Sequence, residues 1–558
     1  MIDGWRHPSG DNAGVLVAVA IDDDGARLRR LTEDGTPNGP VEAVRELPAA
    51  AARLEREHGP RWLWASTAAL YPRLLTAGTR VGRCHDLELT EALLLGHAGQ
   101  WGEPRALAAI WARAAGLPVP SDPPPPESPA AGQGLLFDLP PPSPAAGFDH
   151  LQALIEAYAQ QRARIDTVPE AARFRLLVAA ESAGALVAAE MGHDGLPWRA
   201  EAHDAVLQEL LGEGPPPMGG RPRRLVELAA QISDAFGGLR IHPESPAEVL
   251  RAFSRQGISL PSTRAWVLRR VDHPAVPLLL EFKELYRIWT AHGWAWRAAW
   301  VRDGRFHGEY VPAGVVSGRW ATRGGGALQI PKVVRRAVVA DDGWVFVVAD
   351  AGQLEPRVLA AVAGDAGLAA AAGTGDLYSA LAADAFGGDR ARAKLALLGA
   401  MYGQTGGGAV PALAALQARF PQAWEYVERA ARTGEAGRLV RSWLGRTCPP
   451  PSRLPMTGEQ ARARGRFTRN FVIQATAAEW ALTLLGALRT RLAAAGAGAQ
   501  IVFFQHDEVM VHCPDGAAEA VREAVVSSGE LAGRLQFGET PVRFPLDVSV
   551  VRCYADAA

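Results

Sequence analysis

The sequence is poor in lysine, in paired cysteines and in long apolar runs. Only Lys283, Lys332 and Lys394 supply lysine among its 58 basic residues. The four cysteines are far apart and form no C-x-x-C pair, so neither a zinc ribbon nor a disulfide framework is predicted, and a reducing cytoplasm fits best. No apolar run reaches about 18 residues without charges or helix breakers. With no basic and apolar leader pattern, the protein is expected to be cytosolic, without a membrane anchor.

The overall charge has little excess of either sign. The formal net charge is -2, so any nucleic-acid affinity has to come from locally clustered arginines. Apolar residues make up 48% and charged residues 21% of the chain, which excludes global disorder and leaves ample material for buried cores. At about 150 residues per domain, the length predicts several compact bodies.

Composition and periodicity divide the chain into four parts. Residues 1–116 have the pattern of a small α/β unit, and residues 117–148 are a stiff linker rich in Pro, Ala, Ser and Gly. Residues 149–312 are mainly helical, and residues 313–558 mix short strands with helices. Within these parts the patterns predict strands at 15–21, from Arg27 onward, at 344–349 and at 501–505, and helices at 48–58, 87–115, 174–191 and 477–495.

Two strands deliver carboxylates at their ends. The apolar run 345–349 leads to Asp350, and the run 501–505 leads through a tight hairpin to Asp507 and Glu508. Each aspartate alone is more simply a turn or helix-cap residue. If the strands are neighbours, however, the two carboxylates converge and need cations, which is the arrangement of a two-metal phosphoryl-transfer site.

A helix with basic residues on one face follows the first of these strands. Arg390, Lys394, Leu398 and Tyr402 are four residues apart, with Asp389 as a candidate N-cap. The two cations lie near the helix N-terminus, where the helix dipole adds positive charge, so this face could hold a triphosphate. By itself the face could equally be a solvated stripe.

In this order, these three segments resemble motifs A, B and C of family A DNA polymerases, the bacterial DNA polymerase I family. The resemblance is to its short actinobacterial-type members, which have a degenerate exonuclease-like domain and no 5′-nuclease domain. It covers the chain from about residue 174 onward. Further matches lie at Ser317-Gly318-Arg319, at 328–331, at Gly375-Asp376-Leu377-Tyr378, and at Arg466, Asn470 and Gln474.

The resemblance implies an α+β multidomain fold, a polymerase right hand behind an N-terminal RNase H-like domain of exonuclease type. It places the degenerate 3′-5′ exonuclease-like domain at 1–116, the thumb and connecting helices at 149–312, and the palm at 313–558, with the fingers inserted at about 365–440. The implied activity is template-directed addition of deoxynucleotides to a primer 3′ end, in DNA replication and repair or gap filling.

The resemblance also assigns roles to individual residues. Asp350 and Asp507 would bind two Mg²⁺ ions, with Mn²⁺ as an alternative, and Glu508 would be auxiliary. Arg390 and Lys394 would hold the triphosphate, Lys394 would protonate pyrophosphate, and Glu355 would exclude a 2′-hydroxyl. The remaining nucleotide contacts would be Gln353, Tyr378, Leu398 and Tyr402, and the contacts to primer-template DNA would be Arg319, Arg466, Asn470, Gln474 and His506.

The sequence departs from the family at several places. Ala351 and Gly352 replace the usual tyrosine and serine of motif A, and Leu397 and Leu398 replace an asparagine and an aromatic ring of motif B, so a looser nucleotide pocket is expected. In the N-terminal part, His85-Asp86-Leu87 resembles a short stretch of the family's exonuclease. Asp22-x-Asp24, however, is a hairpin turn more simply than an exonuclease motif, and Tyr71 falls near where a second acid is expected. Proofreading is therefore predicted to be absent.

The sequence also suggests a protein partner and two alternative functions. Residues 133–137, which include Gln133, Leu136 and Phe137, resemble a sliding-clamp peptide, although a linker patch packing on its own domain is the simpler interpretation. A nucleoid-associated, cytoplasmic monomer without membrane contact is expected. The alternatives are a non-catalytic DNA-binding protein on a decayed polymerase scaffold and a single-subunit RNA polymerase, which Glu355 and Glu508 disfavour.

Overall fold

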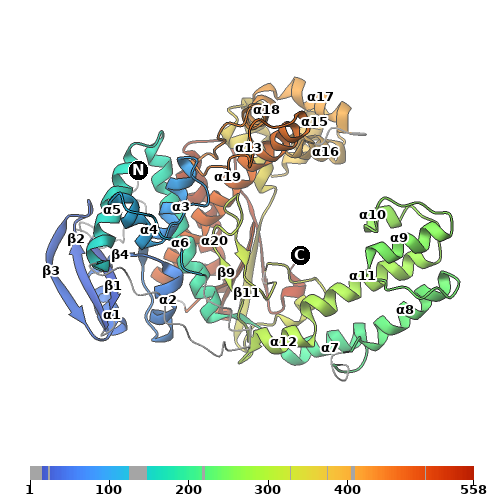
Figure 1. Cartoon of the computed structure of the whole chain (residues 1–558), viewed down its shortest axis with the longest axis horizontal. Coiled ribbons are helices and arrows are strands. Elements are labelled where there is room, and N and C mark those ends of the chain that lie inside the picture. Colours follow the sequence, from blue (N-terminus) through green and yellow to red (C-terminus); the bar gives the residue numbers. More distant parts are fainter. Residues whose placement is uncertain are drawn as a thin grey trace. The chain divides into compact units, whose positions relative to one another are not determined.

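The computed structural model describes residues 15–22, 25–124, 148–215, 220–326, 328–373, 375–403, 409–496 and 498–557 (Figure 1). The chain forms two compact units, each assembled from several segments. The first contains Met1–Asp194, Tyr310–Thr322 and Val347–Val550, and the second contains Gly195–Glu309, Arg323–Phe346 and Val551–Ala558. The residues predicted to form the active site all belong to the first unit.

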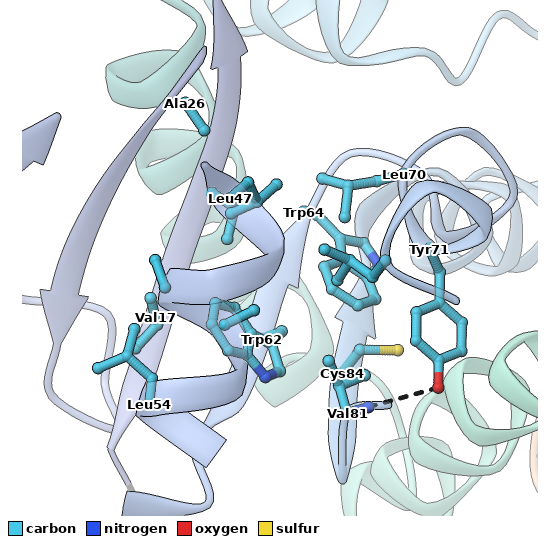
Figure 2. Packing of buried hydrophobic residues seen from close by; sticks show 14 of the residues in the cluster. Val17, Ala26, Leu47, Leu54, Trp62, Trp64, Leu70, Tyr71, Val81 and Cys84 are labelled. Atoms are coloured by element: carbon cyan, nitrogen blue, oxygen red, sulfur yellow. Dashed lines mark hydrogen bonds between the residues drawn. The ribbon is translucent and has the colours of Figure 1, made fainter. Parts of the chain in front are cut away.

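The first unit begins with a five-stranded sheet in the order β3-β2-β1-β4-β5. Alternating residues of β1 face two different cores, one shared with α1 and α2 and the other with α4 and α5. Figure 2 shows Trp62 and Trp64 packed in the first of these cores. The elements are β1 (Leu16–Asp22), β2 (Gly25–Leu31), β3 (Pro37–Val44), α1 (Leu47–His58), β4 (Arg61–Trp64), α2 (Thr67–Thr76), β5 (Arg83–Asp86) and α5 (His150–Asp166).

The helical pattern predicted over residues 87–115 is divided between two helices. The structure has two helices there, α3 (Leu87–His97) and α4 (Leu107–Ala114). Gly99 and Gly102 lie between them with φ angles of 79° and 87°, in the left-handed region that glycine adopts without steric cost. Gly99 follows the C-cap of α3, and Gly102 lies in the turn that separates the two helices.

Two long helices run through the first unit. Helix α6 (Ala171–Asp194) contains the predicted helix 174–191, and α19 (Gly458–Ala495) extends the predicted helix 477–495 toward the N-terminus by about five turns. One window of α19 is long and apolar enough to cross a membrane, but 94% of that window is buried inside the protein. This burial is typical of the core helix of a globular body.

The second sheet of this unit has the strand order β12-β13-β11-β14, and a run of helices follows β11. Helices α14 to α18 occupy the stretch in which a helical insertion is expected. The strands are β11 (Trp344–Ala351), β12 (Gln500–Gln505), β13 (Glu508–Pro514) and β14 (Leu546–Val551). The helices are α13 (Leu354–Val362), α14 (Ala366–Ala372), α15 (Leu377–Ala385), α16 (Arg390–Tyr402), α17 (Ala409–Arg419), α18 (Pro421–Glu435) and α20 (Ala518–Phe537).

The second unit is mainly helical, but the predicted helical part 149–312 is divided between the two units, because α5 and α6 belong to the first. Its buried apolar residues form a core of their own, which includes Phe253, Phe282 and Trp294. A small sheet with the order β6-β8-β7 joins the helices. The elements are β6 (Leu196–Pro197), α7 (Ala200–Leu211), α8 (Arg223–Ala235), α9 (Pro246–Arg255), α10 (Ala265–Leu268), α11 (Ala275–His292), α12 (Trp294–Trp300), β7 (Val301–Arg302) and β8 (Arg305–Phe306).

Candidate active site

Asp350 and Asp507 lie on neighbouring backbone segments. Strand β11 is buried from Val345 to Ala349 and carries Asp350 near its end, while Asp507 lies in the turn between β12 and β13. The Ala351 N–H donates a hydrogen bond to the Asp507 carbonyl oxygen at 3.0 Å. The predicted adjacency of the two strand ends is therefore confirmed at the level of the backbone.

The turn that carries Asp507 is a two-residue hairpin. Gln505 pairs with Glu508, so His506 and Asp507 form the connection. His506 has a φ angle of 59°, in the left-handed region that such tight turns use. This strained conformation places Asp507 at the tip of the hairpin, beside the end of β11.

The carboxylates form a patch of concentrated negative charge. Burial, followed by the charges of Asp507, Glu508 and Asp547, raises the pKa of Asp350 to about 6. Burial also raises the pKa of Asp507. A nearby cation would relieve this repulsion.

The donor set fits magnesium. Within the part of the chain that the structure describes, no three His, Cys, Asp or Glu side chains are arranged around one metal position. Mg²⁺ is commonly held by one or two carboxylates together with substrate phosphates, not by an all-protein cage. The oxygen pair of Asp350 and Asp507 therefore suits an ion that is shared with a phosphate-bearing substrate.

A cavity of about 370 Å³ opens beside these carboxylates. Its walls come from the segment that carries Arg319, the end of β11 together with the start of α13, the end of α16, the middle of α19 and the β12–β13 turn. Five separate stretches of sequence thus converge on one space. The lining residues are Arg319, Asp350, Ala351, Gln353, Leu354, Glu355, Pro356, Tyr402, Ala477, Ala478, His506 and Asp507.

Glu355 is fixed inside this cavity by two partners. Arg319 Nη2 donates to Glu355 Oε1 at 2.5 Å, and the Tyr402 hydroxyl donates to Glu355 Oε2. Burial, and then the bond to Glu355, raises the pKa of Tyr402 well above its ordinary value, so its hydroxyl stays protonated as the donor. Arg319, Glu355 and Tyr402, three of the residues predicted to contact substrate or DNA, thus form one hydrogen-bonded cluster.

Helix α16 has the predicted start and end. The Asp389 carboxylate accepts from the Arg392 N–H at 3.0 Å as the N-cap, and Gly403 ends the helix with a φ angle of 67°. Arg390 and Lys394 are exposed, whereas Leu398 and Tyr402 are half-buried. Of this face, Tyr402 lines the cavity, and the other three residues lie on the same helix outside its lining.

Arg390 already has an anionic partner. Its Nε donates to Asp376 Oδ2 at 2.7 Å, and its guanidinium lies 5.5 Å from the Tyr378 ring centre. The Lys394 ammonium lies 5.8 Å from the same centre. The ion pair with Arg390 is the largest reason why the pKa of Asp376 lies far below its usual range. Asp376 thus forms an ion pair with the guanidinium that is predicted to bind phosphate.

A hydrogen-bond network joins this anion to the start of α13. Gln353, with a φ angle of 60°, donates to Asp376 Oδ1 at 2.6 Å and accepts from the Leu377 N–H at 2.9 Å. Arg357 is only 1% exposed and donates to the carbonyl oxygens of Gly352 at 3.1 Å and Ala372 at 2.7 Å. It also reaches the Arg543 carbonyl oxygen at 2.9 Å.

Asp376 and Arg357 were not predicted as functional side chains. Asp376 precedes a helix as an ordinary N-cap, and its ion pair joins residues 14 positions apart. An arginine within the apolar helix 354–362 was the one available signal for Arg357. Its burial depends on carbonyl groups from distant segments, which periodicity does not reveal.

The predicted DNA contacts on α19 share one helix but not the cavity lining. Arg466 is exposed, and Asn470 and Gln474 are half-buried. Ala477 and Ala478, one turn beyond Gln474, line the cavity. Burial, and then the positive charge of Arg319, lowers the pKa of His506, which favours a neutral ring at the cavity wall.

The N-terminal residues that might have formed an exonuclease site have structural partners. Asp22 accepts from Arg27 at 2.6 Å across the β1–β2 hairpin, as the turn interpretation predicts. Tyr71 is buried and bonds to Glu190 and to the Val81 N–H, the contact drawn in Figure 2. Buried Asp86 caps α3 by accepting from the Leu89 N–H at 2.9 Å.

Comparison with known proteins identifies the fold. At a TM-score of 0.70 the chain resembles the "POL domain of Pol1 from M. smegmatis complex with DNA primer-template and dNTP", with 20% sequence identity and coverage of 98% of this chain and 96% of that one. The structure thus has the fold of a polymerase domain.

The sequence itself is similar to bacterial polymerases over about half its length. It is 28% identical to the thermostable DNA polymerase I of Thermus filiformis, over 50% of this chain and 36% of that protein. It is 30% identical to DNA polymerase I of Chloroflexus aurantiacus, over 39% of this chain and 26% of that protein. The match therefore spans about a third of these relatives or less. The model of DNA polymerase family A matches residues 223–553, more than half of the chain, and the chain belongs to that family.

Proposed function

We propose that the protein is a DNA-directed DNA polymerase, which adds deoxynucleotides to the 3′ end of a primer on a DNA template. One observation carries this proposal: the Asp350 and Asp507 carboxylates meet at a cavity that also contains the Glu355, Arg319 and Tyr402 cluster. Metal-binding oxygens and a nucleotide-sized space thus adjoin each other. A decayed scaffold used only for DNA binding would have no reason to keep this set together.

Asp350 and Asp507 would hold two Mg²⁺ ions, or Mn²⁺, with Glu508 as an auxiliary carboxylate. When bound, the metals lower the pKa of the primer hydroxyl and neutralise the charge that builds up on the phosphates. The raised pKa of Asp350 supports this assignment, because burial and then the charges of the neighbouring carboxylates disfavour its ionised form until a cation is bound.

Arg390 and Lys394 would bind the triphosphate at the N-terminal half of α16. Arg390 would exchange Asp376 for a phosphate group, which an exposed ion pair permits because solvent screens the attraction between its charges. Lys394 would give a proton to the departing pyrophosphate. An ammonium can lose that proton far more readily than a guanidinium, and lysine is otherwise rare in this chain.

Glu355 would select deoxynucleotides, with Gln353, Tyr378, Leu398 and Tyr402 around the incoming nucleotide. Its position, fixed by Arg319 and Tyr402, leaves the side chain unable to move aside for a 2′-hydroxyl. Ala351, Gly352 and Leu398 leave the neighbouring space less filled than in the family pattern. A looser base pocket would reduce fidelity before it reduces catalysis.

Arg319, Arg466, Asn470, Gln474 and His506 would contact the primer-template, and the protein would act as a cytoplasmic, nucleoid-associated monomer. A role in repair or gap filling fits an enzyme without proofreading. The structural partners of Asp22, Tyr71 and Asp86 support that absence. The clamp peptide at Gln133–Phe137 lies outside the described residues, and docking on a sliding clamp is proposed from its sequence alone.

Primer extension tests the proposal. Wild-type protein is incubated with Mg²⁺, a labelled primer-template and separate pools of deoxynucleotides and ribonucleotides. We expect template-dependent extension with deoxynucleotides and none after chelation by EDTA. DNA binding without any extension would favour the non-catalytic alternative, and equal extension with ribonucleotides would remove the role of Glu355.

A further inference from the structure

Helix α19 exposes an aromatic ring in a basic surface. The Phe467 side chain is 46% exposed although phenylalanine is usually buried, and it follows Arg466 directly. Asn470 and Gln474 lie three and seven residues beyond Phe467, so all three share one side of the helix. The ring thus lies on the face that is assigned to DNA contact.

The arginines of this face have no acidic partner, in contrast to their neighbours. Arg462 and Arg466 are exposed and form no ion pair with any residue that the structure describes. Arg469 and Arg432 nearby are paired with Glu428 and Glu425. The positive charge left available is therefore concentrated beside Phe467, where an anionic partner would be attracted.

The face of α19 that carries Phe467, Asn470 and Gln474 extends from the nucleotide cavity toward the N-terminus of the helix. Ala477 and Ala478 line the cavity, and Phe467 lies ten residues earlier on the same helix, which is about 15 Å at 1.5 Å per residue. The Arg466 side chain packs against Gly403 at the end of α16, because a Cβ there would lie 3.1 Å from Arg466 Cγ. The ring is thus several nucleotide lengths from the proposed reaction centre.

The ring is held in place but keeps its exposure. The Arg464 guanidinium lies 5.5 Å from its centre and donates to the Pro449 carbonyl oxygen. Bases inside a duplex are stacked on one another and offer no free face to a side chain. Unpaired bases do stack on exposed aromatic rings, and neighbouring arginines bind their phosphates.

We propose that Phe467, flanked by Arg462 and Arg466, is a stacking platform for an unpaired base of the template strand ahead of the primer end. The platform would hold the single strand through one base face and two backbone phosphates. It would act without reading sequence, because every base has a stacking face. This inference rests on the proposed polymerase function, which supplies a template strand at this position.

Binding measurements on two DNA forms test the platform. Fluorescence anisotropy compares a primer-template carrying a template overhang of about ten nucleotides with the same duplex made blunt. Phe467→Ala is expected to weaken binding of the overhang form about tenfold, within the range of one stacked base, and to leave the blunt form unchanged. Phe467→Trp should retain wild-type affinity for both forms.

Trp266→Ala is the matched control, because Trp266 is 54% exposed and has Arg270 5.2 Å from its ring centre, but lies in the second unit. It should alter neither affinity. Equal affinities of Phe467→Ala and wild type for the overhang form, or equal losses on both forms, would overturn the platform. Wild-type primer extension separates the two proposals: extension without a selective Phe467 effect refutes the platform alone, whereas no extension refutes the polymerase function.

Discussion

Glu355 has a proposed role in sugar selection and a position that is fixed by two hydrogen bonds. It accepts from both Arg319 and Tyr402, so removal of the carboxylate both opens space beside the sugar and releases two donors. Glu355→Ala should raise the use of ribonucleotides relative to deoxynucleotides by about tenfold or more, equivalent to about 1.4 kcal/mol of lost discrimination. The measurement is the ratio of kcat/KM for matched CTP and dCTP.

Tyr402→Phe is the graded control, because it removes one of the two donors and leaves the carboxylate in place. It should change the ratio less than Glu355→Ala does. An unchanged ratio in Glu355→Ala would show that the carboxylate does not exclude the 2′-hydroxyl.

Arg357 holds together three backbone segments next to the site. Its buried guanidinium satisfies carbonyl groups from the β11–α13 turn, from the end of α14 and from the segment that precedes β14. Arg357→Met should lower the free energy of unfolding by about 3 kcal/mol or more, because several buried carbonyls lose their donor together. Urea denaturation measures the change, and the exposed Arg392→Met serves as the control. Equal stability of the two variants would contradict this role.

At the scale of elements, α16 carries the proposed phosphate contacts on one face. Arg390→Ala and Lys394→Ala should each raise the KM for deoxynucleotides about tenfold, because a charge-assisted contact contributes about 1.5–3 kcal/mol. Arg392→Ala lies between them in sequence but on another face, and should leave KM unchanged. A similar increase in all three variants would indicate a general effect of helix charge.

Lys394→Arg separates binding from proton transfer on the same helix. The guanidinium keeps the positive charge, so KM should stay within about threefold of the wild-type value. Because arginine loses a proton far less readily than lysine, kcat should fall. Steady-state primer-extension kinetics would measure both KM and kcat. An unchanged kcat would show that Lys394 binds phosphate but does not donate a proton.

Sequence patterns predicted the elements that have strong local signals. The apolar run before Asp350 and the Asp389 cap with its four-residue spacing define β11 and α16 closely. The four-residue strands β4 and β5 are too short to show a periodicity, and β3 is exposed along nearly all its length. The ion pair of Arg390 with Asp376 and the burial of Arg357 depend on tertiary contacts, so the sequence alone could not show them.

At the scale of the whole molecule, the proposed absence of proofreading concerns the unit that contains the N-terminal sheet. Asp22, Tyr71 and Asp86 are engaged in a hairpin, a buried cluster and a helix cap. The wild-type protein should therefore leave a labelled single strand or a mismatched primer end intact with Mg²⁺ and no nucleotides, as assayed on a denaturing gel. Shortening of the strand that persists in Asp507→Asn would reveal a second metal site.

The central claim is that Asp350 and Asp507 form the catalytic centre, and single-turnover incorporation by Asp507→Asn tests it most directly. We expect a loss of at least about a thousandfold in rate, about 4 kcal/mol, with primer-template affinity within about threefold of wild type. Asp303→Asn, at an exposed turn with a φ angle of 51°, should incorporate at the wild-type rate. Incorporation by Asp507→Asn at the wild-type rate would show that Asp507 is not part of the catalytic centre.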